Sequence, residues 1–355
     1  MKVLVTGATG YIGAVAADAL ASRGHQVLGL TRSERSASAV RERGIQPVLG
    51  DFGDPASLGR AISESRPDAV VSTASVGASS GDNASTFARD REAVRAMREA
   101  LAAYGGALVF TSGSAVFGTF SGGDATDTVY PEDSPLPLPA SVFAPPSSGV
   151  HPLLVAGFGD SMAARVQTEH TVLADGAGRG IVVRPGLVYG RGGNSDITAL
   201  IERARAAGRA GHWGSGGTLQ SYVHVEDLAE LYSLAVENAP HGAILHGAVD
   251  DVSQHELALA INRMIGAGER TDRLSLERML GMNAVARLAL TLTRSLPVDV
   301  MRKIGNSFTP PPSAGSGISL SLNKRLSATA TRELLGWSPT RTDILHDIEL
   351  GSYKN

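Results

Sequence analysis

A glycine-rich turn that follows a short apolar run is the feature that most restricts the fold of this chain. Residues 3–5 are valine and leucine, and the stretch from Thr6 to Gly13 then reads TGATGYIG. An alanine-rich segment of helical length follows and ends at Gly24. In such a strand–turn–helix unit the first glycine permits the turn, the second lets backbone N–H groups approach a pyrophosphate, and the third lets the helix pack on the strand. The pattern predicts a dinucleotide site at Gly7, Gly10 and Gly13.

Short β-branched runs alternate with longer amphipathic segments through the first half of the chain. We expect strands at residues 3–5, 26–30, 46–49, 69–72, 107–110 and 181–183, and helices that include 86–104 and 160–175. This alternation is typical of βαβ units and a parallel sheet. The predicted fold is therefore α/β, a Rossmann doubly wound parallel sheet with a smaller C-terminal substrate-binding lobe.

The alternation of strand-like and helix-like segments is interrupted twice along the sequence, and these interruptions predict the domain organisation. Residues 118–159 contain seven prolines and are too long for a passive connection, so we expect an active-site loop insertion there. Beyond residue 190, helical segments are separated by glycine-rich turns. We therefore expect a dinucleotide-binding domain at 1–190 and a mainly helical substrate-binding lobe at 191–355, and we leave open whether the two exchange elements.

Composition excludes several classes of function. The 32 Lys and Arg residues nearly balance the 35 Asp and Glu residues, giving a net charge of −3, so nucleic acid is not expected as a partner. There is no cysteine, which excludes thiolate nucleophiles and Cys-ligated zinc, and we expect no metal site. The N-terminal residues lack the pattern of a secretory signal, and no apolar stretch is long enough to predict a membrane span. The expectation is a cytoplasmic protein without a membrane partner.

The end of the second predicted strand indicates which cofactor is used. An acidic residue at this point would bind the adenine ribose of NAD, but the sequence reads Gly-Leu-Thr31-Arg32-Ser33. A guanidinium can bind a 2′-phosphate with two hydrogen bonds. The residues Thr31 and Arg32 therefore favour NADP(H) over NAD(H).

Seven motifs in order along the chain give it a family resemblance. They are TGATGYIG at 6–13, GDF at 50–52, DAVVSTA at 68–74, TSGSAVFG at 111–118, RPGLVYG at 184–190, VHVEDLA at 223–229 and LGWSP at 335–339. Together they resemble the extended branch of the short-chain dehydrogenase/reductase superfamily, which holds NAD(P)-dependent epimerases, dehydratases and reductases. The turn and the resemblance together imply these cofactor-binding residues: Gly7, Thr9, Gly10, Tyr11, Ile12, Gly13, Thr31, Arg32, Asp51, Phe52, Thr73, Ala74, Arg165, Pro185 and Val188.

The catalytic pattern of that family is altered here. Extended members carry a Tyr, a Lys four residues later and a Glu four residues further on; counting back from Glu169 places Arg165 at the lysine and Ser161 at the tyrosine. No lysine occurs between Lys2 and Lys303. The chain therefore resembles the atypical members that keep the cofactor fold and lose the Tyr–Lys pair.

Several residues could replace the missing pair. The resemblance implies Ser112 and Ser114 as substrate contacts and Arg165 at the nicotinamide ribose or at a substrate oxygen. Tyr189 is one candidate proton donor. Tyr130, His151, His212, Tyr222 and direct protonation by water are the others.

The substrate region gives one further indication. Members that act on sugar nucleotides carry an arginine where this chain has Gln220, so a small, mostly apolar, non-nucleotide substrate is expected, lined by Trp213, Tyr222, Phe143 and Phe158. The leading hypothesis is an NADP(H)-dependent oxidoreductase that transfers hydride to or from a carbonyl or conjugated alkene. The first alternative is an enzyme without net redox, namely an epimerase, dehydratase, isomerase or cyclase. The second alternative is a catalytically silent NADP-binding sensor. A homodimer is also considered.

Overall fold

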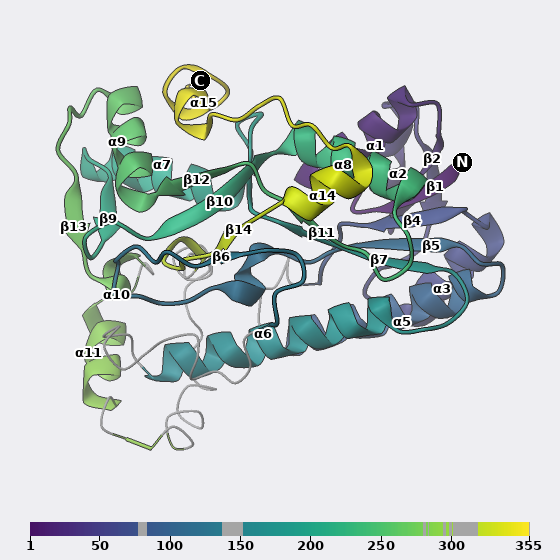
Figure 1. The fold of residues 1–355 in the computed structure, drawn as a ribbon, viewed down its shortest axis with the longest axis horizontal. Coiled ribbons are helices and arrows are strands. Elements are labelled where there is room, and N and C mark those ends of the chain that lie inside the picture. Colours follow the sequence, from purple (N-terminus) through teal and green to yellow (C-terminus); the bar gives the residue numbers. More distant parts are fainter. Residues whose placement is uncertain are drawn as a thin grey trace.

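The computed structural model describes residues 1–76, 84–136, 152–279, 282, 284–293, 296–297, 300 and 319–354. A seven-stranded parallel sheet forms the centre of the molecule, in the strand order β11-β7-β5-β4-β1-β2-β3 (Figure 1). Its strands are β1 (Lys2–Thr6), β2 (Gln26–Thr31), β3 (Gln46–Leu49), β4 (Ala69–Ser72), β5 (Ala107–Thr111), β7 (Arg179–Pro185) and β11 (Ile244–Gly247). The chain runs outward from β1 to β3 and then crosses to β4 on the other side of β1. This reversal is the doubly wound topology that the sequence predicts.

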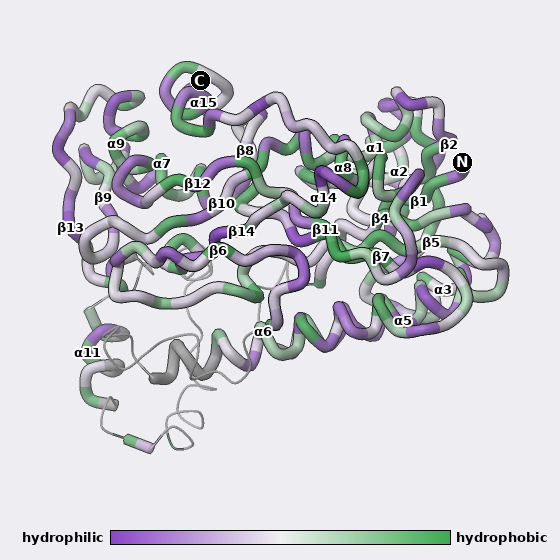
Figure 2. The backbone as a smooth tube through the Cα atoms, viewed as in Figure 1, coloured by the Kyte–Doolittle hydropathy of each residue, from purple (hydrophilic) through white to green (hydrophobic). Residues whose placement is uncertain are grey.

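Helices cover both faces of this sheet. One face is covered by α1 (Tyr11–Ser22), α2 (Glu34–Arg41) and α8 (Val225–Asn238), and the other by α3 (Pro55–Ser65), α5 (Ala84–Ala102) and α6 (Pro152–Leu173). Figure 2 shows hydrophilic and hydrophobic turns alternating along α5 and α6, as expected for helices with one buried face. Strand residues such as Val70 and Val71 are fully buried, since both faces of the sheet are covered.

A smaller lobe is built mainly from the second half of the chain. It contains three small sheets, with β12-β10-β8, β13-β9 and β14-β6 as their strands. The strands are β6 (Val129–Tyr130), β8 (Leu187–Tyr189), β9 (Gly211–Trp213), β10 (Leu219–His224), β12 (Asp250–Ser253), β13 (Asp272–Leu274) and β14 (Arg325–Leu326). The helices are α7 (Ser195–Ala207), α9 (Gln254–Ile265), α10 (Leu276–Met279), α11 (Ala284–Thr293), α14 (Thr329–Leu335) and α15 (Ile344–Leu350), and η1 (Ser114–Phe117) is a 3-10 turn after β5.

The predicted fold class is confirmed, and two predicted boundaries differ from the structure. Strand β11 and helix α8 belong to the large sheet and its covering layer, although both lie beyond residue 190. Helix α6 begins at Pro152, so the last residues of the predicted 118–159 loop are helical. Within the earlier part of that loop, β6 pairs with β14, and residues 137–151 lie outside the described residues.

None of the helices in the described ranges is both long enough and apolar enough to span a bilayer. Within the same ranges, no cluster of three or more His, Cys, Asp or Glu side chains is arranged to hold a metal ion.

Candidate functional site

The carboxyl ends of the central strands lie in one row. Thr6 of β1 is in register with Ser72 of β4, Ser72 with Phe110 of β5, and Phe110 with Val182 of β7. Parallel strands lie about 4.8 Å apart, so the loops after β1 and β5 are roughly 10 Å from each other. The chain reverses direction between β1 and β4, and ligands of open α/β sheets bind at such a crevice. We therefore place the candidate active site at this edge.

The three glycines after β1 have different structural roles. Gly7 has a φ of +72°, a backbone conformation that residues other than glycine rarely adopt. A Cβ at Gly13 would lie 2.3 Å from the Gly7 carbonyl oxygen and 2.5 Å from Thr73 Oγ1, so this glycine permits close packing of α1 on the strand ends. A Cβ at Gly10 would meet only the Gly7 oxygen, at 3.1 Å. Gly10 therefore borders open space.

The open space beside Gly10 lies at the N-terminus of α1. Gly10 is the N-cap of this helix, no side chain caps it, and its first turn contains no acidic residue. The exposed Thr9 precedes it. Uncapped N–H groups and the positive end of the helix dipole attract an anion. The turn thus fits a pyrophosphate group in the way the sequence predicts.

Thr73 and Ala74, which follow β4, form hydrogen bonds with Thr6 at the start of the glycine turn. The Thr73 hydroxyl donates to the Thr6 carbonyl at 2.7 Å, and the Ala74 N–H donates to Thr6 Oγ1 at 3.2 Å. Both residues lie at the site, where their hydrogen bonds shape the turn.

Arg43 is a contributor to this turn that the sequence analysis missed. Its guanidinium donates to the Ala8 carbonyl at 3.2 Å and to the Ala14 carbonyl at 2.6 Å, and it pairs with Asp18 at 2.5 Å. These contacts hold the turn against the first part of α1. No local pattern signals this role, because Arg43 lies about thirty residues beyond the turn.

The residues predicted to bind the adenosine half surround the end of β2. Arg32 is exposed, and within the described residues no ion pair engages it. Thr31 is buried and its hydroxyl donates to the Val48 carbonyl at 3.4 Å, so it faces the sheet. Asp51 is exposed and accepts the Gly53 N–H at 2.8 Å, which leaves its second carboxylate oxygen for a ligand. The neighbouring Phe52 packs partly against the core.

At the end of β5, Ser112 presents an unsatisfied hydroxyl. The Ser112 N–H donates to the Val183 carbonyl at 2.8 Å, which fixes its backbone against β7. Its Oγ is buried and has no hydrogen-bond partner among the described residues. A buried hydroxyl without a partner costs free energy, and a substrate oxygen would supply the missing hydrogen bond. Ser114 is also buried and opens the η1 turn directly after this point.

Arg165 on α6 is joined to this strand end. Its Nη2 donates to the carbonyl of Ser112 at 2.7 Å and to that of Thr111 at 3.1 Å. Its guanidinium carbon lies 4.8 Å from the centre of the Phe87 ring, a cation–π contact. Arg165 is therefore not on a solvated helix face, and the structure brings Arg165 and Ser112 together.

A buried ion pair fixes the register of α6 on the sheet. Glu169 lies one helical turn beyond Arg165. Its Oε2 accepts a hydrogen bond from Arg184 Nη2 at 2.6 Å, and both of its carboxylate oxygens lie 3.2 Å from the donor Arg184 Nε. Both side chains are almost completely buried. Removing one partner of such a pair leaves an uncompensated charge, so the pair strongly favours this single placement of α6. Arg165 is held at the strand end as a result.

Tyr189 is not brought to this centre. Its hydroxyl donates to the Arg341 carbonyl at 3.0 Å, and its ring packs edge-on against His224. The side chain belongs to the apolar cluster of the small lobe, and burial raises its pKa well above the ordinary value. These contacts account for Tyr189 by packing in the small lobe, and its role as proton donor stays a prediction.

Four other residues predicted to contact the cofactor lie near this edge of the sheet. The Tyr11 hydroxyl donates to the Gly190 carbonyl at 2.9 Å and thereby joins the glycine turn to the loop after β8. Pro185 ends β7, and the Val188 carbonyl accepts Asn194 Nδ2 at 2.6 Å. Ile12, partly buried, packs on the core beneath the turn.

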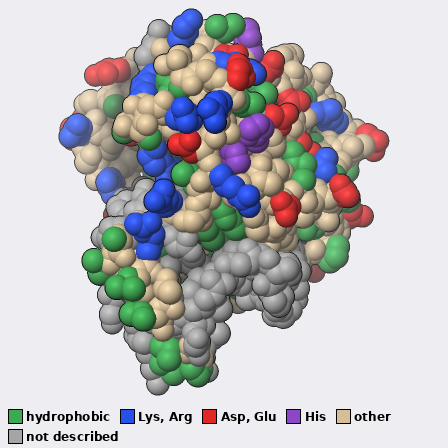
Figure 3. All heavy atoms as spheres, turned by 90° about the vertical axis from the view of Figure 1, so that its left-hand side faces the viewer, with side chains coloured by type: hydrophobic (Ala, Val, Ile, Leu, Met, Phe, Trp, Pro, Cys, Tyr) green, Lys and Arg blue, Asp and Glu red, His purple; other side chains and the backbone are tan. Residues whose placement is uncertain are grey.

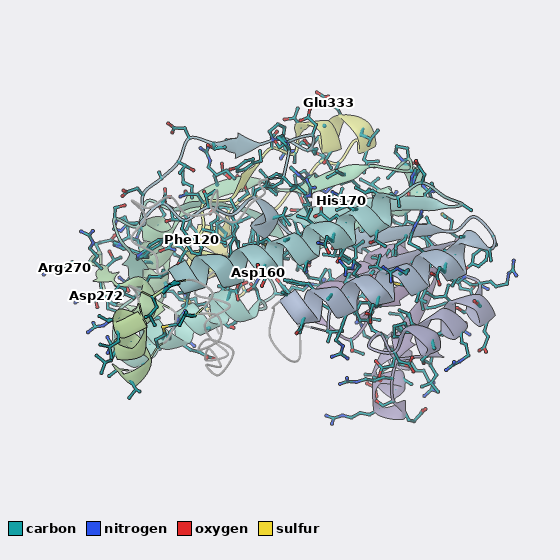
Figure 4. All side chains as sticks on the ribbon, turned by 90° about the horizontal axis from the view of Figure 1, so that it is seen from below. Phe120, Asp160, His170, Arg270, Asp272 and Glu333 are labelled. Carbon is teal, nitrogen blue, oxygen red and sulfur yellow. The ribbon has the colours of Figure 1, made fainter. Side chains whose placement is uncertain are left out.

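Three aromatic side chains that pack on one another in the core of the large sheet form an aromatic wall. Phe120 packs edge-on against Phe158, with ring centres 5.6 Å apart, and against Trp213 at 6.3 Å. Figure 4 shows Phe120 beside the first turns of α6. Phe158 and Trp213 are expected lining residues, whereas Phe120 was missed because nothing in its local sequence distinguishes it. The predicted lining residue Tyr222 lies elsewhere, fully buried in the core of the small lobe, and Phe143 lies outside the described residues.

Comparison with known proteins gives the family. The model of the NAD dependent epimerase/dehydratase family matches residues 3–144 and 162–246. The chain is 25% identical over 360 residues to the uncharacterized protein YLL056C of Saccharomyces cerevisiae, covering 98% of both chains. It is 27% identical over 277 residues to the 2-alkyl-3-oxoalkanoate reductase of Stenotrophomonas maltophilia, covering 75% of this chain and 76% of that protein.

A solved structure shows the same fold. The human epimerase family protein SDR39U1, crystallised with NADPH, superposes with a TM-score of 0.63 at 19% identity, covering 99% of both chains. The family match spans more than half of the sequence and contains the glycine turn, Ser112 and Arg165. The chain therefore belongs to the NAD dependent epimerase/dehydratase family.

Proposed function

We propose that this chain is an NADP(H)-dependent oxidoreductase that transfers hydride between the cofactor and a carbonyl or conjugated alkene of a small, mostly apolar metabolite. The observation that carries the proposal is the buried Ser112 hydroxyl, which has no hydrogen-bond partner among the described residues, at the strand end whose backbone carbonyl binds Arg165. Such a hydroxyl suits an oxygen on which negative charge develops during hydride transfer.

The choice of cofactor rests on the end of β2. The exposed Arg32 has no ion-pair partner among the described residues, and no carboxylate stands where NAD would need one. The similar solved structures include complexes with NAD and with NADPH, so fold alone does not decide. An unpaired guanidinium at this position supports a 2′-phosphate.

The substrate class rests on the aromatic wall and on Gln220. The buried aromatic wall formed by Phe120, Phe158 and Trp213 makes the surroundings of this part of the molecule apolar. Gln220 is buried and neutral, and its amide nitrogen donates to the Leu320 carbonyl at 2.6 Å, so it cannot clamp a diphosphate. The relative named 2-alkyl-3-oxoalkanoate reductase acts, by its name, on a ketone that carries alkyl groups. A ketone of that kind is our preferred substrate class.

In the proposed reduction, the bound cofactor supplies the hydride to the carbonyl carbon. Ser112 donates a hydrogen bond to the carbonyl oxygen and stabilises its developing charge. Arg165 holds the two carbonyls at the end of β5 and so fixes the direction of that hydroxyl. The oxygen then takes a proton from water.

The main alternative is an epimerase or dehydratase that retains its cofactor without net redox, which the family name equally supports. The experiment that separates the two follows the nicotinamide absorbance of NADPH while 2-alkyl-3-oxo acids of increasing chain length are added. We expect stoichiometric NADPH oxidation, faster for the longer chains. Conversion of substrate with no change in NADPH would support the alternative, and tight NADPH binding without any conversion would support the sensor.

Replacing Arg32 by alanine tests the cofactor assignment separately. We expect the wild type to bind NADPH more tightly than NADH, and we expect Arg32→Ala to lose about 1.5–3 kcal/mol of NADPH binding while NADH binding is unchanged, since only the 2′-phosphate contact is removed. Calorimetric titration measures both affinities. The exposed Arg60 on α3 provides the matched control as Arg60→Ala. Equal affinities for both cofactors in the wild type would contradict the assignment.

A further inference from the structure

A pocket in the small lobe lies apart from the candidate active site. It has a volume of about 410 Å³ and lies between helices α7 and α9, closed at one end by β9 and β13. Its walls are one face of each helix: Leu200, Ala204 and Ala207 on α7, and Leu257, Ala258 and Ile261 on α9. The alanines leave the space between the two helices open. At roughly 30 Å³ per water-sized unit, the pocket has room for about a dozen non-hydrogen atoms.

The floor of this α7–α9 pocket has no free hydrogen-bonding group. Gln254 lines it, yet its carbonyl oxygen accepts the Trp213 N–H at 2.9 Å and its amide nitrogen donates to the Leu320 carbonyl. Leu320 and Leu274 complete the floor with apolar side chains. An occupant must therefore be apolar along its buried part.

The mouth of the pocket is basic. Arg203, Arg209 and Arg278 line it against a single acid, Asp272, which pairs with Arg209 at 3.2 Å. Basic side chains gather on this face of the lobe in Figure 3, and Figure 4 shows Asp272 at its outer edge. Burial lowers the pKa of the Arg203 guanidinium below its ordinary value, and the Arg209 Nε is buried without a partner among the described residues. An anion at the mouth would satisfy the Arg209 Nε.

The pocket and the candidate active site share no side chain. Among its lining residues, Leu257, Ala258, Ile261 and Leu320 belong to the apolar cluster of the small lobe. Phe120, Phe158 and Trp213 of the aromatic wall belong to the core of the large sheet. Among the described residues, hydrogen bonds join the two regions: the backbone N–H of Trp213 donates to Gln254, and the amide of Gln220 donates to the carbonyl of Leu320.

We propose that the α7–α9 pocket is a second binding site for an amphiphilic anion, whose apolar chain lies between the helices and whose acidic head lies among the arginines. The inference does not depend on the proposed reaction. Decanoate is a suitable probe, because its size matches the pocket and because decanol offers the same chain without the charge.

The test is calorimetric titration of the full chain with decanoate, with and without NADPH, below the concentration at which decanoate forms micelles. We expect one saturable site, binding of decanol weaker by about tenfold, and the same decanoate affinity when NADPH is present. Ala258→Phe fills the pocket and is expected to weaken decanoate binding at least about tenfold, whereas Arg209→Gln weakens it by about threefold to tenfold. Ala330→Phe, at an exposed site on α14, is the control and should bind as the wild type does.

Several results would overturn the proposal of a second binding site. Absence of a saturable heat does so directly, as does equal binding by Ala258→Phe and Ala330→Phe. Loss of binding in Ser112→Val with retention in Ala258→Phe would place decanoate in the active site. Melting curves check that Ala258→Phe is folded, and if it is not, Arg209→Gln with the decanol comparison still decides the question. None of these readouts requires turnover, so failure of the proposed reaction leaves the test intact.

Discussion

Replacing Gly10 by valine is expected to weaken NADPH binding by at least about a hundredfold while the protein stays folded. A Cβ at this position meets only the Gly7 carbonyl oxygen, at 3.1 Å, which a small shift of the turn relieves. The φ of Gly10 is −85°, a value that valine adopts readily. The added side chain would instead fill the space in front of the α1 N-terminus, where the pyrophosphate would bind. Calorimetric titration with NADPH and a thermal melt measure the two effects separately.

Gly13→Val is the informative comparison. Its Cβ would lie 2.3 Å from the Gly7 oxygen and 2.5 Å from Thr73 Oγ1, so α1 would have to move away from the strand ends. We expect this variant to lose thermal stability as well as NADPH binding. The surroundings of the two glycines thus agree with the different roles that the sequence motif predicts for them. Normal NADPH binding by Gly10→Val would show that the dinucleotide does not lie at this turn.

Much of the fold was predictable because local signals and topology agree. The alternation of β-branched runs with amphipathic segments places six of the seven strands of the large sheet. The sequence also indicates a short strand at 243–246, where β11 lies, but assigns it to the smaller lobe, because it follows that lobe's elements in sequence and joins the large sheet only through β7. The start of α6 at Pro152 was missed since a proline-rich context favours a loop, whereas packing of Phe158 on Phe120 stabilises a helix there.

The candidate site was less predictable, because several of its contacts are long-range. Ser112 and Arg165 follow from the motif register, but their hydrogen-bonded connection is visible only in the structure. Arg43 reaches the glycine turn from beyond α2, and Phe120 meets Trp213 from a distant part of the chain. The hydrogen bond from the Tyr189 hydroxyl to the Arg341 carbonyl is likewise a long-range contact that the motif does not indicate.

Arg165→Ala is expected to lower turnover by about two orders of magnitude, equivalent to roughly 3 kcal/mol of transition-state stabilisation. The guanidinium donates to the Thr111 and Ser112 carbonyls and stacks on Phe87, so its loss frees the strand end that directs the Ser112 hydroxyl. Arg165→Lys should recover little, because an ammonium group cannot reproduce the planar guanidinium that binds both carbonyls and stacks on the ring. The measurement is steady-state kinetics at saturating NADPH.

A positioning role for Arg165 predicts a particular division of the kinetic loss. The fall should lie in kcat with little change in KM, since a hydrogen bond to developing charge strengthens mainly in the transition state. Ser112→Ala should give a similar fall, and the double variant Ser112→Ala with Arg165→Ala should be little worse than either single variant, because both remove the same interaction. A merely structural role would instead lower the melting temperature, leave kcat per folded molecule unchanged and make the two losses additive. Additive losses, or near-wild-type turnover in Arg165→Ala, would show that Ser112 is directed by other contacts.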